Sequence, residues 1–228
     1  SVCAAIRIGL KSIGSISDVH ISHCSMKNVW REGIKIECSE GGNISDINIQ
    51  DITMNDVSRP IFILLNNRFE PDDLGSSLEL DHIPEIGTMS DIIISDIIAS
   101  DSDEMRNTHY RFDDDVMGSP KFAGIRIDAE KNHPIRNLTL RNISYKFIGG
   151  VKLSDIPNEY PEVIDKLIDC DTLSSENYYP DWSRASFMDI RNIIGLNVRN
   201  IQCFAIYPDE RRGIITENVQ FSDNSDNL

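Results

Sequence analysis

The sequence has 228 residues, of which 40% are hydrophobic, so it is long enough to form one sizeable core. Acidic residues outnumber basic ones by 37 to 22, and the net charge of −15 argues against nucleic acid or an anionic membrane as a partner. No apolar run approaches the roughly 18 residues of a membrane span, and the first residues lack the basic and apolar regions of a signal peptide.

Five segments of the chain repeat one pattern of alternating apolar and polar residues. Three apolar columns recur in every segment, and Asp, Asn or His residues stand between them, which is the period of a strand. β-branched residues dominate, as strands prefer. The segments begin at Ile16, Ile44, Met89, Ile135 and Ile193 and read ISDVHISHCSM, ISDINIQDITM, MSDIIISDIIA, IRNLTLRNISY and IIGLNVRNIQC.

A second series of short apolar segments precedes these units, so each repeat carries at least two strands. The spacings between units, 28, 45, 46 and 58 residues, indicate a solenoid whose basic coil receives insertions at one corner. Strands that recur in the same order and direction pair in parallel, which predicts a parallel β-helix. The second series reads AAIRIG from Ala4, EGIKIE from Glu32, RPIFIL from Arg59, FAGIRI from Phe122 and SFMDIR from Ser186.

We therefore predict an all-β chain in which residues 1–228 belong to one parallel β-helix domain. A β-sandwich is the alternative, but the short Asn-Gly hairpin turns that would join its strands are absent. The insertions are expected at about 65–88, 100–121 and 149–183, with a tail at 222–228, and PEVIDKLID from Pro161 is expected to form a short helix. Since the first strand begins close to Ser1 with nothing before it to cap the stack, we expect that N-terminal coils are lacking.

The middle residues of the second series form a column that should point outward: Arg7, Lys35, Phe62, Arg126 and Asp189. The next outward positions add Glu37 and Asp128. Like charges on neighbouring rungs repel, so the Arg7 and Lys35 pair suggests an anionic ligand or nearby carboxylates. The alternative is a solvated charged face balanced by glutamates.

Other polar patterns favour structural roles. Asp18, Asp46, Asp91 and Asn137 recur in every coil, as turn and strand-edge hydrogen bonding would require, so they are not interpreted as catalytic carboxylates. The five cysteines lack metal or disulfide spacing. Neither His20 with His23 nor the run Asp113–Asp115 has the spacing of a metal site, so no metal and no cofactor are expected.

The coils AAIRIG...ISDVHISHC and EGIKIECSEGGNISDINIQDITM resemble the C-terminal half of the family 28 glycoside hydrolases, the polygalacturonase-like enzymes. The segments GIRIDAEKNHPIRNLTLRNISYKFIGG and IRNIIGLNVRNIQCFAIYPDERRGIITENV look like the last coils of its bacterial branch. The resemblance implies a right-handed, single-stranded parallel β-helix and inverting hydrolysis of pectic or related polysaccharide. It also favours an extracellular or periplasmic location.

Two motifs of that family are altered in this sequence. The family's Asn-Thr-Asp stretch and Asp-Asp pair, which supply the general acid and base, would precede Ser1, so the catalytic residues are expected upstream. Ala4 stands where the resemblance implies a histidine, and Lys35-Ile36-Glu37 matches the Arg-Ile-Lys that holds a uronate carboxylate. Because Glu37 beside a uronate would bring two carboxylates together, a neutral or differently substituted sugar fits better.

The expected function is therefore glycoside hydrolysis, with a polysaccharide or oligosaccharide as the partner. The residues expected to bind it are Arg7, Lys35, Glu37 and Phe62. Two alternatives remain open: a polysaccharide lyase, in which Arg7 and Lys35 would supply the base and the cations, and a non-catalytic β-helix that binds glycan or is structural.

Overall fold

The computed structural model describes residues 4–9, 12–67, 69, 82–102, 124–155 and 185–223. It is all-β, as predicted. Most of the three predicted insertions, the expected helix within 161–169, the run Asp113–Asp115 and residues 224–228 lie outside the described residues. The described strands are β1 (Ile6–Ile8), β2 (Ser15–Cys38), β3 (Asn43–Leu65), β4 (Thr88–Ser100), β5 (Ile125–Ala129), β6 (Ile135–Gly149), β7 (Ala185–Tyr207) and β8 (Arg212–Phe221). A 3-10 turn, η2 (Leu153–Asp155), lies between β6 and β7.

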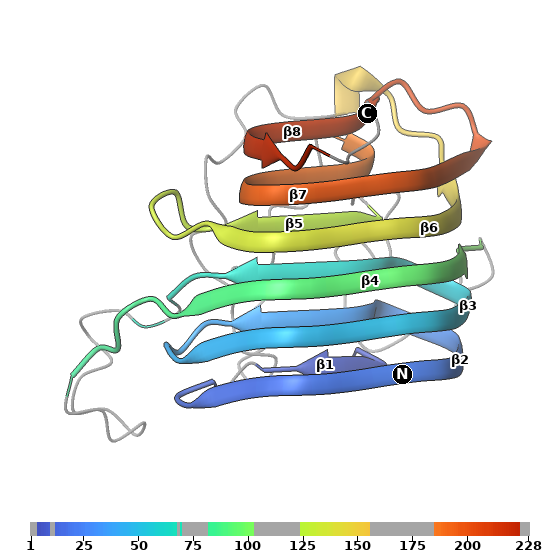
Figure 1. The fold of residues 1–228 in the computed structure, drawn as a ribbon. Helices are drawn as coiled ribbons and strands as arrows, with labels where there is room; N and C mark the ends of the chain where they lie inside the picture. The colour runs from blue at the N-terminus through green and yellow to red at the C-terminus, as the bar shows by residue number, and fades with distance from the viewer. Residues whose placement is uncertain are drawn as a thin grey trace.

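The strands pair in parallel and stack on one another in the order β1, β2, β3, β4, β6, β7 (Figure 1). β5 pairs with both β3 and β7, so β3, β4, β6, β7 and β5 form a closed ring of pairings. β8 adds to β7. The labelled chain ends lie toward opposite ends of this stack.

Two ladders of strand segments run along the stack. The first ladder contains residues 6–8, 32–38, 59–65, 125–129, 185–191 and 212–217. The second ladder contains residues 15–29, 43–57, 88–100, 135–149 and 193–207. These are the two series of strands that the sequence predicted. β8, the outermost strand, was not predicted, because its apolar residues Ile214 and Val219 repeat the pattern over too short a length.

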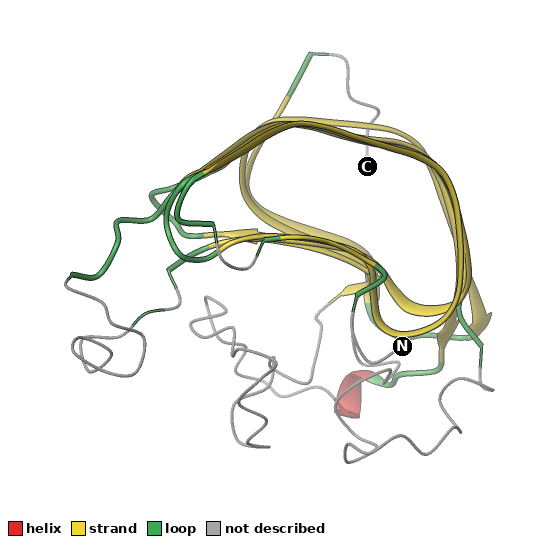
Figure 2. Ribbon diagram, turned by 90° about the horizontal axis from the view of Figure 1, so that it is seen from below, coloured by secondary structure: helices red, strands yellow, loops and turns green. Residues whose placement is uncertain are grey.

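The long strands bend at Asp and Asn residues with positive φ. In β3 these are Asp46, Asp51 and Asp56, each at φ 55°. Asp and Asn tolerate the left-handed region better than other residues with a Cβ, so the chain turns a corner there and keeps its pairing. Viewed along the stack, the corners superpose and the strands enclose the core (Figure 2). Equivalent corners occur at Asp18, His23, Asn28, Asp91, Asp96, Asn137, Asn142, Asn192, Asn200 and Asn218.

The corner side chains bond to one another along the stack. The amide of Asn137 donates to Asp91 Oδ1 at 2.9 Å, and the amide of Asn142 donates to Asp96 Oδ1 at 2.8 Å. Asn200 in turn donates to Asn142 Oδ1 at 3.0 Å. These bonds confirm the structural role that the sequence indicated for the polar columns.

Inside the coil, the three predicted apolar columns of the second ladder form the core. Their members in β3, β4 and β6 are buried and stack in register, and those in β2 are partly buried at the end of the stack. Tyr145, Phe147 and Phe187 add an aromatic stack with ring centroids 5.8 to 6.4 Å apart. The Tyr145 hydroxyl donates to the Ser58 carbonyl at 3.1 Å, which satisfies the one polar atom of this buried ring.

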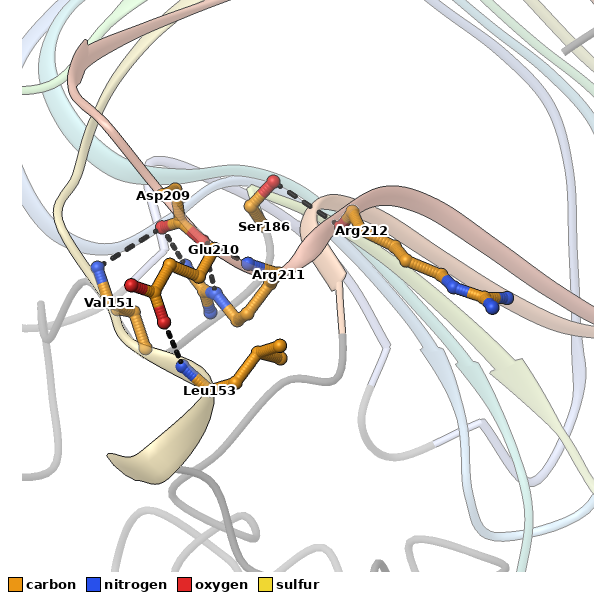
Figure 3. Close-up of polar contacts among 7 residues, drawn as sticks. All are labelled: Val151, Leu153, Ser186, Asp209, Glu210, Arg211 and Arg212. Atoms are coloured by element: carbon orange, nitrogen blue, oxygen red, sulfur yellow. Dashed lines mark hydrogen bonds and ion pairs between the residues drawn. The ribbon is translucent and has the colours of Figure 1, made fainter.

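The connection between β7 and β8 is held by charged groups (Figure 3). Arg211 donates to both carboxylate oxygens of Asp209, at 2.9 and 2.8 Å, and the Arg211 side chain is buried. The N–H of Val151 donates to Asp209, and that of Leu153 donates to Glu210 at 2.9 Å. The two N–H bonds therefore join the turn after β6 to the turn after β7, and the bidentate Arg211 pair fixes Asp209 within its own turn.

None of the described residues belongs to a helix long and apolar enough to cross a membrane.

Candidate functional site

The outward column predicted from the sequence runs in register through five strands of the first ladder. Arg7 pairs with Lys35, Lys35 with Phe62, Phe62 with Arg126, and Arg126 with Asp189. Their chain neighbours, such as Ile34, Ile36, Ile61 and Ile63, belong to the apolar core, whereas the column itself does not. The column therefore lies on the face opposite the core, which we call the outer face.

The alternative interpretation, a solvated charged face, does not fit the burial of this column. Lys35, Phe62, Arg126 and Asp189 are all buried, and only Arg7 keeps substantial exposure, at 28% of its side chain. Alternation along a strand determines the face on which a side chain lies, but it does not determine whether other parts of the protein cover that face. The charged groups consequently meet each other in a poorly solvated setting, where electrostatic interactions are stronger.

At the β1 and β2 end of the column, Glu37 contacts two cations. Lys35 Nζ lies 3.0 Å from Glu37 Oε1, and Arg7 Nη2 lies 3.4 Å from Glu37 Oε2. Glu37 is therefore one nearby carboxylate of the kind that the pair of basic residues suggested. Two positive charges share one negative charge here.

Phe62 lies between two cations. Lys35 Nζ is 5.3 Å from the centroid of its ring, and the Arg59 guanidinium is 5.5 Å from it, distances at which a cation and an aromatic ring attract each other. Arg59 is also 3.5 Å from Glu32. Sequence reasoning missed Arg59 as part of this group, although its pairing with Glu32 follows from the same repeat.

Further along the same face, four charged side chains alternate in sign. Arg126 pairs with Asp189 across the strands and lies 3.8 Å from Asp128, while Arg191 lies 3.6 Å from Asp189. All four are buried. Glu217 on β8 approaches Arg191 to 3.7 Å from the more exposed edge. The sequence analysis did not identify Arg191, which lies two residues after Asp189 and therefore on the same face of the strand.

The carboxyl group of Asp128 is unusual within this cluster. Burial raises its pKa to about 6, against the opposing attraction of Arg126 and Arg191, and the negative charge of Asp189 acts in the same direction as burial. A hydrogen bond from the Ala129 backbone also opposes the rise. Asp128 therefore changes its charge near neutral pH, as proton-exchanging groups in functional sites do.

A separate surface pocket of about 650 Å³ lies along the first row of corners in the second ladder. Two of the corner residues on its wall, Asp91 and Asn137, bond to each other along the stack. Among the described residues, no group of three or more His, Cys, Asp or Glu side chains is arranged to hold a metal ion. The pocket is lined by Asp18, His20, Asp46, Ile47, Asn48, Asp91, Ile93, Asn137 and Thr139.

No protein-family model matches the sequence, and no curated protein or solved structure is significantly similar to the chain. The chemistry of the site therefore has to be derived from its own residues. On the outer face of the first ladder, the buried side chains of Phe62 and Leu64 have carboxylates and cations on both sides.

Proposed function

We propose that the protein is a glycoside hydrolase that acts on pectic or related polysaccharide with inversion. We propose further that its fold is a right-handed, single-stranded parallel β-helix that resembles the C-terminal coils of the family 28 enzymes. The parallel stacking of the two ladders and their corners supports this fold. In the proposed enzyme, the outer face of the first ladder is the floor of the substrate site.

The observation that carries the proposal is the combination of Phe62 with Lys35 and Glu37 in register on one face. Phe62, packed against the Lys35 ammonium group, holds it in position, while Glu37 accepts hydrogen bonds from hydroxyl groups of the sugar and Lys35 donates to ring or hydroxyl oxygens. Arg7, the most exposed member of the column, can extend these contacts toward solvent. The four residues therefore bind and orient the substrate.

In an inverting hydrolase, one carboxylic acid protonates the leaving glycosidic oxygen and a carboxylate activates the attacking water. The family resemblance implies that those two groups are carried by coils N-terminal to the aligned segment. Under this proposal, the residues of the present chain position the sugar for that attack. They contribute to both affinity and rate, since a misplaced sugar is poorly attacked.

The proposal is tested by incubating the natural protein, purified from its source, with a panel of plant and microbial polysaccharides. Release of reducing ends without ultraviolet-absorbing unsaturated ends supports hydrolysis, and polarimetry of the fresh products should reveal inversion. Appearance of unsaturated ends would instead assign a lyase. A Phe62→Leu variant is expected to lower kcat/KM at least tenfold. Phe204→Leu, which changes an exposed ring at the far end of β7, is the matched control and should be neutral.

A non-catalytic glycan-binding or structural β-helix is the second candidate. Ala4, which stands at the position of the histidine in the matched motif, favours it. This reading predicts that the same panel yields binding but no released product. If the protein neither binds nor cleaves any member of the panel, only a structural role remains and the hydrolase proposal is rejected.

A further inference from the structure

The C-terminal part of β7 has one edge with no strand beside it in the described part of the chain. β6 pairs with β7 as far as Tyr207, whereas β8 pairs with β7 only as far as Leu196 (Figure 1). On the side away from β6, no described strand therefore lies beside residues 201–206, which we call the open edge. The backbone N–H and C=O groups of an exposed strand edge can pair with another chain, so natural proteins shorten, charge or cover such edges.

The open edge lacks the charges and prolines that usually protect an exposed strand. Its sequence is IQCFAI. Residues 202–206 are all exposed, and Phe204 and Ile206 are 55% and 38% exposed. Although the whole chain has a net charge of −15, this segment is neutral and apolar, so two copies of it can approach each other without repulsion.

The core side of the coil is also open along this edge. Cys203 and Ala205 pair in register with Tyr145 and Phe147, which belong to the core, yet both are themselves exposed. Residues that pair in register point to the same face, so these two side chains face the interior of the stack. A strand added along the open edge would therefore bury apolar side chains as well as bond to the backbone.

The charges that flank the open edge favour a second copy in the antiparallel direction. Arg199 and Glu210 are both exposed. If two copies pair with Phe204 opposite Phe204, Val198 lies opposite Glu210, so Arg199 of each copy comes next to Glu210 of the other. A parallel pair would instead place Arg199 against Arg199. Arg199 already pairs with Arg141 across the strands, and a carboxylate from a second copy offsets this pair of like charges.

We propose that the open edge is a dimer interface at which a second copy of this chain pairs antiparallel, about a twofold axis at Phe204. The interface is isologous, because each copy contributes the same strand and the two Phe204 rings meet at the axis. Backbone hydrogen bonds along residues 201–206 continue the sheet from one copy into the other. This inference does not depend on the proposed function, since the open edge lies on the second ladder and the proposed substrate site lies on the first.

The test measures the mass of the natural protein by analytical ultracentrifugation over about a hundredfold range of concentration. The mass should rise from that of one chain to that of two. Phe204→Lys and Ile206→Lys place a charge on the open edge and should each weaken the association at least tenfold. Ile98→Lys is the matched control, because Ile98 is 65% exposed but β4 has a strand on each side, and it should change the association less than twofold.

The antiparallel geometry is tested with two variants that change a flanking charge. Arg199→Glu and Glu210→Lys should each associate poorly alone, because like charges then meet at both ends of the interface. A mixture of the two variants should associate at least fivefold more tightly than either alone, because both ends of the mixed dimer then pair opposite charges.

A disulfide tests the position of the axis. Directly opposite residues of an antiparallel pair lie about 4.5–5.5 Å apart at Cα, which a disulfide can span. In a Cys203→Ala background, Phe204→Cys should therefore give a covalent dimer with oxidised glutathione, whereas Ile98→Cys should not. Phe204→Cys adds no charge, so it keeps the test valid if a lysine variant does not fold.

Three results would overturn the proposal. A protein that remains a single chain at every concentration leaves the open edge to a different partner. A mixture of Arg199→Glu and Glu210→Lys that associates no better than its components, or a Phe204→Cys variant that forms no more covalent dimer than Ile98→Cys, excludes antiparallel pairing about Phe204.

Discussion

The ammonium group of Lys35 lies 3.0 Å from Glu37 Oε1, and the two side chains are only 5% and 1% exposed. Lys35→Met should therefore lower the free energy of unfolding by about 2–3 kcal/mol. The substitution leaves Glu37 as a buried carboxylate that has lost its ion pair with Lys35 and keeps the one with Arg7. Urea unfolding at pH 7 measures this change. Lys27→Met, at an exposed position of β2, should change stability by less than about 0.5 kcal/mol.

The cost of Lys35→Met should come from Glu37 rather than from the lost lysine itself. The double variant Lys35→Met with Glu37→Leu is therefore expected to recover part of the lost stability, since it removes the buried charge as well. If the double variant is less stable than the sum of the two single variants, the pair is not coupled in this way.

The sequence predicted that Lys35 points outward, which is correct, but it did not predict that Lys35 is buried. The repeat predicted which residues pair across the strands, and the pairs from Arg7 to Asp189 lie as expected. It also predicted the face, because the period of a strand is fixed. Alternation along a strand carries no information about burial on the outer face, so neither the burial of Lys35 nor the shifted pKa of Asp128 could be read from the pattern.

For the corner residues, in contrast, the side-chain contacts were predicted and the backbone conformation was not. The recurrence of Asp and Asn in each coil predicted hydrogen bonding between coils, and the Asn137 to Asp91 contact bears this out. Their left-handed backbone was not predicted, although Asp and Asn are the residues that adopt it most readily after glycine. As a result, each predicted pair of strands is in places one bent strand, as in β2 and β3.

Asp128 should make stability depend on pH. Its folded pKa of about 6 lies above the ordinary value of 3.8, so between these two values the folded state binds more protons than the unfolded state. The free energy of unfolding should therefore fall as pH rises from about 4 to 6.5, by up to about 3 kcal/mol for this group. Asp128→Asn should remove this decline, which denaturant melts across that pH range will measure.

Asp96 provides a control of opposite sign. Hydrogen bonds, first from Asn142 and then from Ser95, lower the pKa of this carboxyl. Its stabilising contribution is therefore present above its ordinary pKa and is lost as pH falls toward the lowered value. Asp96→Asn should alter only the acidic limb of the profile. An Asp128→Asn profile that keeps the full decline between pH 4 and 6.5 would contradict the assignment to Asp128.

Asn142 combines backbone and side-chain roles at one corner. It has φ 52°, donates to Asp96 and accepts from Asn200. Asn142→Ala should lower the free energy of unfolding by about 1–2 kcal/mol, because it loses both bonds and places a Cβ without polar compensation in the left-handed region. Asn142→Gly relieves the backbone cost and should lose less. Equal losses for the two variants would show that the backbone conformation contributes nothing at this corner.

Gly124 precedes β5 and lies against the aromatic stack. A Cβ at this position would be 2.2 Å from Tyr145 Cε1, so Gly124→Ala must displace a ring that packs on Phe147 and Phe187. A loss of about 1–3 kcal/mol in the free energy of unfolding is expected, as for other overpacked cores. Gly14→Ala is the control, because no atom lies within 4 Å of the added Cβ, and it should be neutral or slightly stabilising. In a Tyr145→Leu background the cost of Gly124→Ala should shrink, since the ring that it strikes is gone, and an unchanged cost would locate the clash elsewhere.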